Sequence, residues 1–548
     1  MSDKKVGSDV ERPMSPAGLT RRDFLKISGA GLAGAALLGV AGCGGGGGGG
    51  QQGGGGGGGN SLIVALDQEP AILNQFIVGG DLAATNNITS AIIESPLRIM
   101  PDLSFEPQLA DGMPKVIQDD PLVIEYKLKD GLKWSDGKPL TSADAKWTYE
   151  QQVAKKNQII TRFGWEKVTK FETPDDLTVR ITFSEPFAPW MSILGGSATQ
   201  ILPKHVYEGK DFNKVMNDEL VGSGPFKLKE WKKGQSVVVE RNENYWGEKA
   251  PLDQITYRFI PDTNTLVTSL QSGEVEFINP PPDIGLLEKL EGIDGATVEY
   301  KSGTVYEHIT FNVEKIDNLK MRQAIAYGIN RDQAVEQILK GQVTPLNSFL
   351  VPEQKPFATP AWEKYTYDKA RATQLVEEAK AEGAATEITF STTSDARLRE
   401  TLQEVIQQQL KDIGITVKID NSSAETFFGE RTPAGDFEMG EWAWLANPDP
   451  SSTTIFAGNQ VPPKGQNYAR YKNDEVTRLL EDSDKAIDEA ERADLLKQAQ
   501  ELIAEDLPML PMYQRPEYYA WAERLSGPDV NPTIAGPFWN VGEWSVSG

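Results

Sequence analysis

Residues 387–419 have the sequence EITFSTTSDARLRETLQEVIQQQLKDIGITVKI, and this stretch decides the fold class. Short apolar runs at 387–391 and 415–419 predict two strands, and about 395–413 predicts a helix that Gly414 ends. The apolar residues of this helix fall on one face: Leu398, Leu402, Val405, Ile406, Leu410 and Ile413. A strand, a helix and a strand at this spacing make an α/β unit.

The same alternation continues on both sides of this unit. Further strands are predicted at residues 61–66, 122–128, 177–183 and 236–241. Further helices are predicted at 145–152 after a capping box of Thr141 and Asp144, at 319–340, and at about 488–505 after Asp488 and Glu491. The chain from residue 60 to residue 548 is longer than one hydrophobic core usually supports, so we expect an α/β protein with at least two lobes.

The start of the chain predicts export. Arg21 and Arg22 precede an uncharged, apolar stretch at 27–42, a pattern typical of a twin-arginine signal peptide. This stretch has fewer than the roughly 18–20 residues that a bilayer-spanning helix needs. We therefore expect a signal peptide at residues 1–42.

Cys43 is the only cysteine of the chain and follows three small residues. Its surroundings resemble the site at which bacterial lipoproteins are cleaved and lipidated, and the alternative is a stray thiol in a flexible tail. Residues 44–59 are almost entirely glycine and predict a flexible coil. We expect 43–60 to be a lipidated tether that holds the protein on the extracytoplasmic face of a bacterial cell membrane.

Composition argues against several classes of function. The formal net charge of −24 repels nucleic acid, so we expect no nucleic-acid partner. Two histidines, His205 and His308, provide neither a three-histidine zinc site nor HExxH. No nucleophile elbow, P-loop or dinucleotide fingerprint occurs. We expect no catalytic residues, no metal, no cofactor and no enzyme activity, although the carboxylates are too numerous for sequence to pair, which leaves a glycosidase open.

Six segments together carry a resemblance to a known family. They are LKDGLKWSDGKPLT (128–141), GSGPFKL (222–228), RNENYW (241–246), LQSGEVE (270–276), MRQAIAYGINR (321–331) and LPMLPMY (507–513). Their order and spacing resemble the family 5 extracellular solute-binding proteins of ABC importers. The resemblance implies a two-lobe periplasmic-binding-protein-like fold of the class II type with an extra subdomain in the first lobe. Lobe I is then expected at 61–308 plus 513–548, its subdomain at about 100–205, and lobe II at 309–512.

The resemblance also implies candidate ligand contacts. Peptide-binding members offer the aspartate of a Trp-x-Ala-Asp stretch to the amino terminus of the peptide, and the matching stretch here is WLANPDP at 444–450. Asn447 stands at the aspartate position, and its amide cannot form the charge-assisted bond that an ammonium group favours. This weakens the case for peptides with a free amine, and Asp449 is the candidate substitute.

Aromatic residues are the other candidates. We expect Trp442 and Trp444, which flank Ala443, to point to opposite faces of a strand, so that one lies in the core and the other lines the cleft. An exposed tryptophan suits stacking on a sugar or an aromatic group. Tyr306, near the first crossing between the lobes, is a further candidate.

The function implied is a receptor that captures an oligopeptide or another small polar solute between two lobes and delivers it to an importer. Its expected partners are that solute, the permease subunits of the importer and, through the lipid anchor, the membrane, with the protein itself a monomer. Oligosaccharide binding is the first alternative, and a sensor or chaperone of the same fold that feeds no importer is the second.

Overall fold

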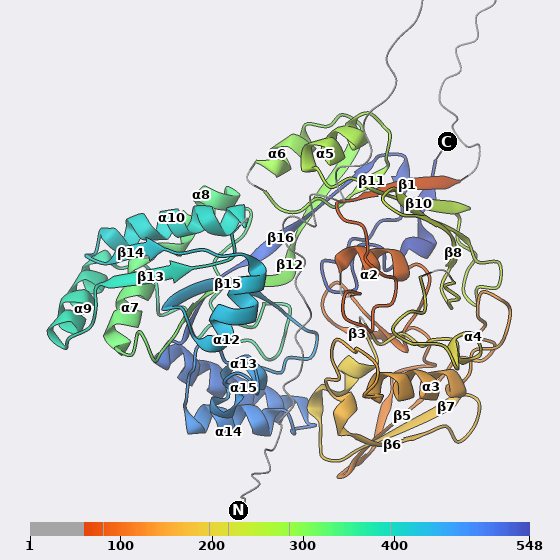
Figure 1. Cartoon of the computed structure of the whole chain (residues 1–548), viewed down its shortest axis with the longest axis horizontal. Coiled ribbons are helices and arrows are strands. Elements are labelled where there is room, and N and C mark those ends of the chain that lie inside the picture. The colour runs from red at the N-terminus through yellow and green to blue at the C-terminus, as the bar shows by residue number, and fades with distance from the viewer. Residues whose placement is uncertain are drawn as a thin grey trace, which may run out of the picture. The chain divides into compact units, whose positions relative to one another are not determined.

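One ten-stranded sheet runs through both lobes, in the order β14-β13-β15-β12-β16-β11-β1-β10-β9-β8 (Figure 1). The computed structural model describes residues 60–547 except 81, 197, 218, 284 and 395, so Arg21, Arg22 and Cys43 lie outside the described residues. At the centre of the sheet, the long strands β12 (Ala296–Phe311) and β16 (Met509–Ala522) pair antiparallel and carry the chain between the lobes. We call these two the hinge strands.

Lobe I is built on the half of the sheet that begins at β16. Strand β1 (Ser61–Leu66) lies parallel to β10 (Gln254–Phe259) and to β11 (Phe277–Ile278). Strands β9 (Ser236–Arg241) and β8 (Phe226–Lys232) follow antiparallel. Because β1 and β11 are parallel, the loops that follow them leave the same edge of the sheet, and this edge faces lobe II.

Lobe II contains the predicted α/β unit. Strands β13 (Glu387–Ser391) and β14 (Thr416–Ile419) are parallel, and α10 (Arg397–Lys411) connects them. Leu402, Ile406, Leu410 and Ile413 of the predicted apolar face are at most 3% exposed. Strand β15 (Met439–Leu445) joins β13 to the hinge strand β12. The prediction of an α/β fold is confirmed.

The subdomain of lobe I has a sheet of its own. Its order is β4 (Lys115–Asp119), β5 (Leu122–Lys127), β7 (Thr178–Phe183) and β6 (Val168–Glu172), all antiparallel. Helix α3 (Ser142–Val153) begins at the predicted capping box, in which Thr141 and Asp144 bond each other's backbone. Apolar residues of the subdomain form a hydrophobic core separate from those of lobe I and lobe II.

The predicted helix at 319–340 is wrong as a single helix. The structure has two, α7 (Leu319–Gly328) and α8 (Arg331–Leu339), because Ile329 adopts an extended conformation. The Asn330 side chain accepts a bond from the backbone of Gln333 and so caps the second helix. The apolar periodicity of the sequence does not reveal this break, because the cap is formed by the polar side chain of Asn330.

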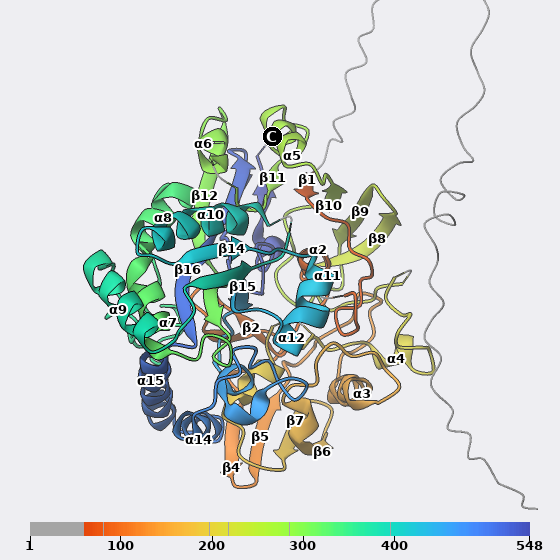
Figure 2. The ribbon, with the colours of Figure 1, turned by 60° about the vertical axis from the view of Figure 1, so that its left-hand side comes forward.

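Helix α15 (Glu489–Asp506) begins where Asp488 caps it, as predicted, and packs against α14 (Asp474–Ser483). Figure 2 shows α7, α8, α9 and α10 around the sheet of lobe II. No helix of the described part of the chain is both long and apolar enough to cross a membrane. The remaining elements are α2 (Ala83–Thr89), α4 (Lys204–Tyr207), α5 (Thr263–Gln271), α6 (Leu286–Glu291), α9 (Lys369–Ala381), α11 (Ala424–Thr426), α12 (Thr432–Ala434), α13 (Thr453–Phe456), β2 (Leu97–Ile99), β3 (Phe105–Pro107), β17 (Leu525–Ser526) and β18 (Ser545–Val546).

The lobe boundaries expected at residues 308/309 and 512/513 fall inside β12 and β16. Each hinge strand therefore belongs to both lobes, and the exact residue at which one lobe gives way to the other stays a prediction.

Candidate functional site

Two cavities lie where lobe I and lobe II face each other. The first, which we call the hinge cavity, has a volume of about 480 Å³. Lobe I lines it with the loop after β1, the start of α2, residues 160 and 161, and the segment 531–537. The hinge strands contribute Thr304, Val305, Glu517 and Tyr519, and lobe II contributes Leu445 at the end of β15.

Backbone irregularity at the hinge makes room for this cavity. The pairing of β12 with β16 is interrupted between Ser302 and Tyr306, and Thr304 and Val305 sit in the interruption. A Cβ on Gly303 would lie 3.0 Å from the Glu517 side chain, so the glycine leaves space for that carboxyl group. On its other side β12 stays paired here, since Val305 pairs with Leu445 of β15, and this brings lobe II to the cavity wall.

Amide side chains supply most of the polar lining. Asn86 of α2 donates from its side chain to the Ile534 carbonyl at 2.9 Å, and its amide oxygen accepts a bond from Gln75 at 3.3 Å. Asn279, directly after β11, donates to the Tyr518 carbonyl at 2.9 Å. The amide hydrogens are thus already used, because Asn86 also donates to the Ala535 carbonyl at 3.2 Å and Asn279 also bonds Glu517, so these amides offer a solute the acceptor capacity of their oxygens.

Glu517 is the carboxyl group in the lining of the hinge cavity. Burial raises the pKa of Glu517 to about 7, although a bond from Asn279 and the charge of Arg515 act to lower it. Near neutral pH this carboxyl group is therefore divided between its neutral and charged forms.

Apolar side chains line the mouth from both lobes. Ile160 of lobe I is 37% exposed, and Leu445 of lobe II is 40% exposed. Large apolar groups exposed at a concave site indicate a surface that a ligand or domain closure covers.

A buried ionic cluster joins lobe II to the hinge strands. Glu307 of β12 is 1% exposed and accepts bonds from the Nε atoms of Arg399 (α10) at 3.0 Å and Arg515 (β16) at 2.5 Å. Burial acts to raise the pKa of Glu307, but the two guanidinium groups outweigh it and hold the pKa below its usual value. On β15, Glu441 is fully buried, neither of its carboxyl oxygens has a partner, and burial raises its pKa well above the usual value. Glu307 is thus charged and Glu441 is neutral.

The expectation that Trp442 and Trp444 point to opposite faces is wrong. Residues two apart on a strand share a face, and the two ring centroids lie 6.5 Å apart. Both rings pack against His308 of β12 and against Tyr468, and Trp442 is 1% exposed. Burial lowers the pKa of His308 well below its usual value, which keeps the ring neutral. These four side chains form an aromatic cluster inside lobe II.

The other sequence-predicted residues are scattered. Tyr306 is 4% exposed and lies beside His308, and its burial raises the pKa of its phenol. Asn447 is exposed, and its carbonyl accepts a bond from Gln354 at 2.8 Å. Asp449 is buried in an ion pair with Arg492.

None of the five candidates lines the hinge cavity, although Trp444 and Asn447 lie close in sequence to Leu445, which does. Their contact with a solute stays a prediction.

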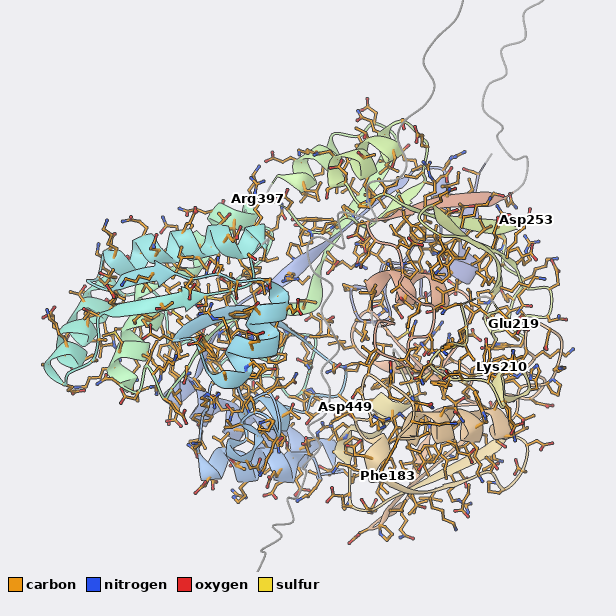
Figure 3. All side chains as sticks on the ribbon, in the orientation of Figure 1. Phe183, Lys210, Glu219, Asp253, Arg397 and Asp449 are labelled. Carbon is orange, nitrogen blue, oxygen red and sulfur yellow. The ribbon has the colours of Figure 1, made fainter. Side chains whose placement is uncertain are left out.

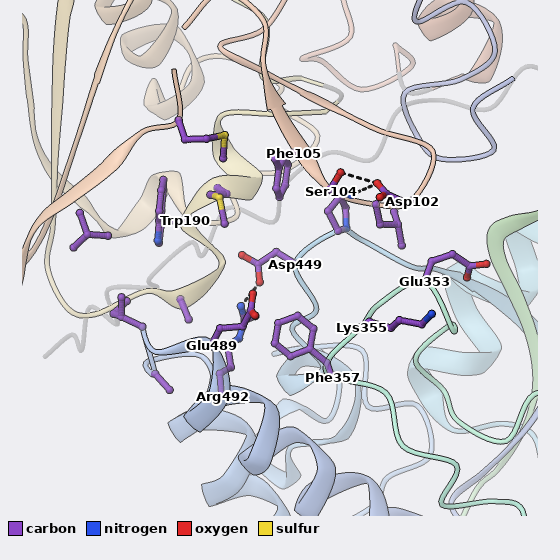
Figure 4. A pocket seen from close by; sticks show the side chains of 18 of the residues that line it. Asp102, Ser104, Phe105, Trp190, Glu353, Lys355, Phe357, Asp449, Glu489 and Arg492 are labelled. Carbon is purple, nitrogen blue, oxygen red and sulfur yellow. Dashed lines mark hydrogen bonds and ion pairs between the residues drawn. The ribbon is translucent and has the colours of Figure 1, made fainter. Parts of the chain in front are cut away.

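Asp449 lines the second cavity, which we call the subdomain cavity. It has a volume of about 710 Å³ and lies between the subdomain of lobe I and the loops and helix α15 of lobe II (Figure 4). Figure 3 shows Asp449 on the side of lobe II that faces the subdomain, whose strand β7 ends at the labelled Phe183. The two cavities have no lining residue in common.

Sequence reasoning missed the residues of the hinge cavity. Gln75, Asn86, Asn279 and Glu517 come from parts of the chain more than 400 residues apart. One signal was present: ligands of open α/β sheets bind beyond the carboxyl ends of the strands. Strand β1 was predicted correctly, and the loop that follows it lines the cavity.

A comparison with known protein families identifies the family of this chain. Residues 104–463 match the family described as bacterial extracellular solute-binding proteins, family 5. The chain belongs to this family. The two-lobe fold and the role of an extracytoplasmic solute-binding receptor follow from membership, and both confirm what the six sequence segments implied.

Curated family 5 proteins cover nearly the whole chain. The oligopeptide-binding protein AppA of Bacillus subtilis (strain 168) is 28% identical over 510 residues, which are 88% of this chain and 91% of AppA. The glutathione-binding protein GsiB of Shigella dysenteriae serotype 1 is 28% identical over 477 residues, which are 84% of this chain and 92% of GsiB.

Solved family 5 structures agree with the fold. Bacillus subtilis AppA in complex with a nonapeptide matches with a TM-score of 0.72 and 27% identity, over 89% of this chain and 99% of AppA. The ABC transporter substrate-binding protein CtaP of Listeria monocytogenes matches with a TM-score of 0.80 and 25% identity, over 89% of this chain and 100% of CtaP.

Proposed function

We propose that this receptor binds a short peptide, or another small solute rich in amide groups, in the hinge cavity and delivers it to an ABC importer. The observation that carries the proposal is the lining of this cavity by both lobes at the hinge strands. A solute that fills it contacts Asn86 and Asn279 on one side and Leu445 on the other. Such a solute stabilises the closed arrangement of the lobes by its differential affinity for that arrangement.

The chemistry of the lining favours a peptide. The amide oxygens of Asn86 and Asn279 can accept bonds from peptide N–H groups, whereas Gln75 and Asn531, which also line the cavity, are bonded within the protein. Ile160 and Leu445 provide apolar surface for side chains of the solute. Relatives whose names give a peptide ligand, AppA and GsiB, agree with this choice.

Glu517 provides the carboxyl group for a peptide ammonium group that Asn447 does not provide. Asn447 lacks the charge that an ammonium group favours, whereas Glu517 brings a carboxyl group into the hinge cavity itself. A peptide whose ammonium group reaches Glu517 binds the ionised form of this carboxyl group. Binding therefore shifts the protonation equilibrium of Glu517 toward the ionised form.

Oligosaccharide binding loses its main support in the structure. The argument for a sugar rested on an exposed tryptophan, but Trp442 and Trp444 pack in the aromatic cluster and do not line the hinge cavity. The family to which the chain belongs binds solutes, and we propose no catalytic step for it.

The remaining proposals concern location and assembly. Arg21 and Arg22 support export of the folded chain, and Cys43 supports a lipid anchor on the outer face of the membrane. The receptor is proposed to work as a monomer with the permease subunits of the importer. Cys43→Ser tests the anchor: the variant should leave the membrane fraction in washes without detergent, and retention there contradicts the proposal.

Thermal unfolding of the full chain tests the choice of solute. A panel of tri- to pentapeptides is compared with oligosaccharides of similar mass. Bound peptide should raise the melting temperature by mass action, and the rise should vanish in Leu445→Arg, which places a charge at the cavity wall. A rise with a sugar but with no peptide contradicts the proposal.

A further inference from the structure

The subdomain cavity is closed by parts of both lobes. Strands β3 and β4 and residues 188–191 of the subdomain form one wall, and residues 352–357, 448–449 and 486–492 of lobe II form the other. A direct backbone bond crosses beside it, from the Ala188 N–H to the Asp484 carbonyl at 2.7 Å. The cavity therefore lies at a second contact between the lobes, away from the hinge strands.

Asp449 reaches this cavity with unused bonding capacity. The residue is 7% exposed, one carboxylate oxygen is bound by Arg492, and the other has no hydrogen-bond partner. In Figure 4 its carboxyl group points into the space between Trp190, Phe105 and Arg492. This second oxygen is itself buried from solvent, so the carboxylate keeps an unsatisfied negative charge beside the cavity.

Negative charge exceeds positive charge around the cavity. Four carboxyl groups line it, on Asp102, Glu353, Asp449 and Glu489, against two cations, on Lys355 and Arg492. Asp484 lies close enough to act on the pKa of Asp449 as well. Burial raises the pKa of Asp449 to about 6, so the group is mostly ionised at neutral pH. The electrostatic balance favours a cation.

The apolar side chains of the cavity wall favour a cation whose uncharged part is apolar. Phe105, Trp190 and Phe357 surround the Asp449 carboxyl group in Figure 4, and Met113 and Met191 complete the wall on the subdomain side. Aromatic faces attract ammonium groups, and thioethers adapt to irregular apolar shapes. The guanidinium of Arg492 already lies over the Phe357 ring, 5.2 Å from its centroid, whereas Phe105 and Trp190 are the other two aromatic rings of the cavity wall.

We propose that the subdomain cavity is a second ligand site, which takes a compact organic cation with an apolar body, such as an arylalkylammonium, and holds its ammonium group close to the Asp449 carboxylate. The site is separate from the one that binds the transported solute. Because its walls belong to both lobes, an occupant favours the arrangement in which the subdomain and lobe II stay in contact, and so it acts on closure of the receptor.

Calorimetric titration of the full chain with phenethylammonium tests the site, with the neutral isostere 2-phenylethanol as the reference ligand. Met113 is 43% exposed on the cavity wall, so a charge can be placed there without disturbing the core. Met113→Arg should weaken phenethylammonium binding about fivefold, and Met113→Glu should strengthen it. Ile117→Arg is the matched control, because Ile117 is 49% exposed on β4, which begins two residues after Met113, and lies outside the cavity lining.

Two further variants complete the test. Asp449→Asn should abolish the preference for phenethylammonium over 2-phenylethanol, and Leu445→Arg in the hinge cavity should leave phenethylammonium binding within twofold of the wild type. The inference is overturned if phenethylammonium does not bind, if 2-phenylethanol binds equally well, if the two Met113 variants behave alike, or if Leu445→Arg removes binding. Because the Met113 pair does not touch the buried ion pair, a folding defect of Asp449→Asn leaves the test intact.

Discussion

The hinge cavity and the subdomain cavity lie between the same two lobes but differ in chemistry. Amide groups, one carboxyl group of raised pKa and apolar side chains line the hinge cavity. Three aromatic rings and a surplus of carboxylates line the subdomain cavity. The first touches the strands that carry the chain between the lobes, and the second touches loops far from them. We therefore propose that an occupant of the hinge cavity acts on closure directly, whereas an occupant of the subdomain cavity acts through a peripheral contact.

The largest expected effect concerns the ionic cluster beside the hinge cavity. Glu307→Gln leaves the buried Arg399 and the partly exposed Arg515 without their carboxylate and should lower the free energy of unfolding by about 3 kcal/mol. Urea denaturation measures the loss. Glu243→Gln, which breaks an exposed ion pair with Lys249, is the control and should change stability by less than about 1 kcal/mol. A loss for Glu307→Gln as small as that of the control contradicts the role assigned to the cluster.

The next effect separates the two cavities. Leu445→Arg puts a charge against the apolar wall of the hinge cavity and should weaken peptide binding about 100-fold, or ~2.7 kcal/mol. Met113→Arg, in the subdomain cavity, is the counterpart and should leave peptide affinity within about threefold. Isothermal titration with a peptide found in the thermal panel gives both values. Equal losses would mean that the cavities form one site.

A smaller effect depends on pH. Because the pKa of Glu517 is raised to about 7, its ionised fraction rises about tenfold between pH 6 and pH 8. Affinity for a peptide with a free amino terminus should rise about fourfold over this range, because the peptide's own amino group, with a pKa of about 8, loses part of its charge by pH 8. Glu517→Gln should remove this rise. An N-acetylated peptide is the matched ligand and should show no rise. If both peptides follow pH alike, Glu517 does not receive the ammonium group.

The same raised pKa has a consequence for stability. Between its usual value of 4.5 and about 7, the unfolded chain releases the Glu517 proton while the native state retains it. Stability contributed by this group is therefore present at low pH and is lost as pH rises through that window. Glu517→Gln should flatten this part of the pH–stability curve, and a steeper curve in the variant contradicts the assignment.

The smallest effect concerns the aromatic cluster. Trp444→Phe keeps an aromatic ring beside Tyr468 and should change peptide affinity by less than about twofold, because Trp444 does not line the hinge cavity. A loss of tenfold or more would show that Trp444 touches the solute after closure, as the sequence had suggested.

Local patterns made much of the fold predictable. The α/β unit at 387–419, the capping box at Thr141, the N-cap at Asp488 and strand β1 follow from apolar period and cap chemistry, which act within a few residues. The break at Ile329 was not predicted, because an extended residue between two amphipathic helices leaves the apolar pattern of the sequence unchanged.

The site was less predictable because it depends on contacts between distant segments. Asn86, Asn279 and Glu517 converge only through the order of strands β1, β11 and β16 in the sheet. The placement of Trp442 and Trp444 on opposite faces failed for a simpler reason, since the two-residue period of a strand puts them on one face. Asp449 was expected to replace Asn447 as the partner of an ammonium group, which stays a prediction, and nothing in its sequence neighbourhood indicated Arg492 as its partner.

Mass spectrometry of the small molecules carried by the purified full chain tests the central claim most directly. The claim predicts peptide masses on the wild type and on Met113→Arg, and their absence from Leu445→Arg. Peptides retained by Leu445→Arg, or a bound sugar in their place on the wild type, would contradict the assignment of the solute to the hinge cavity.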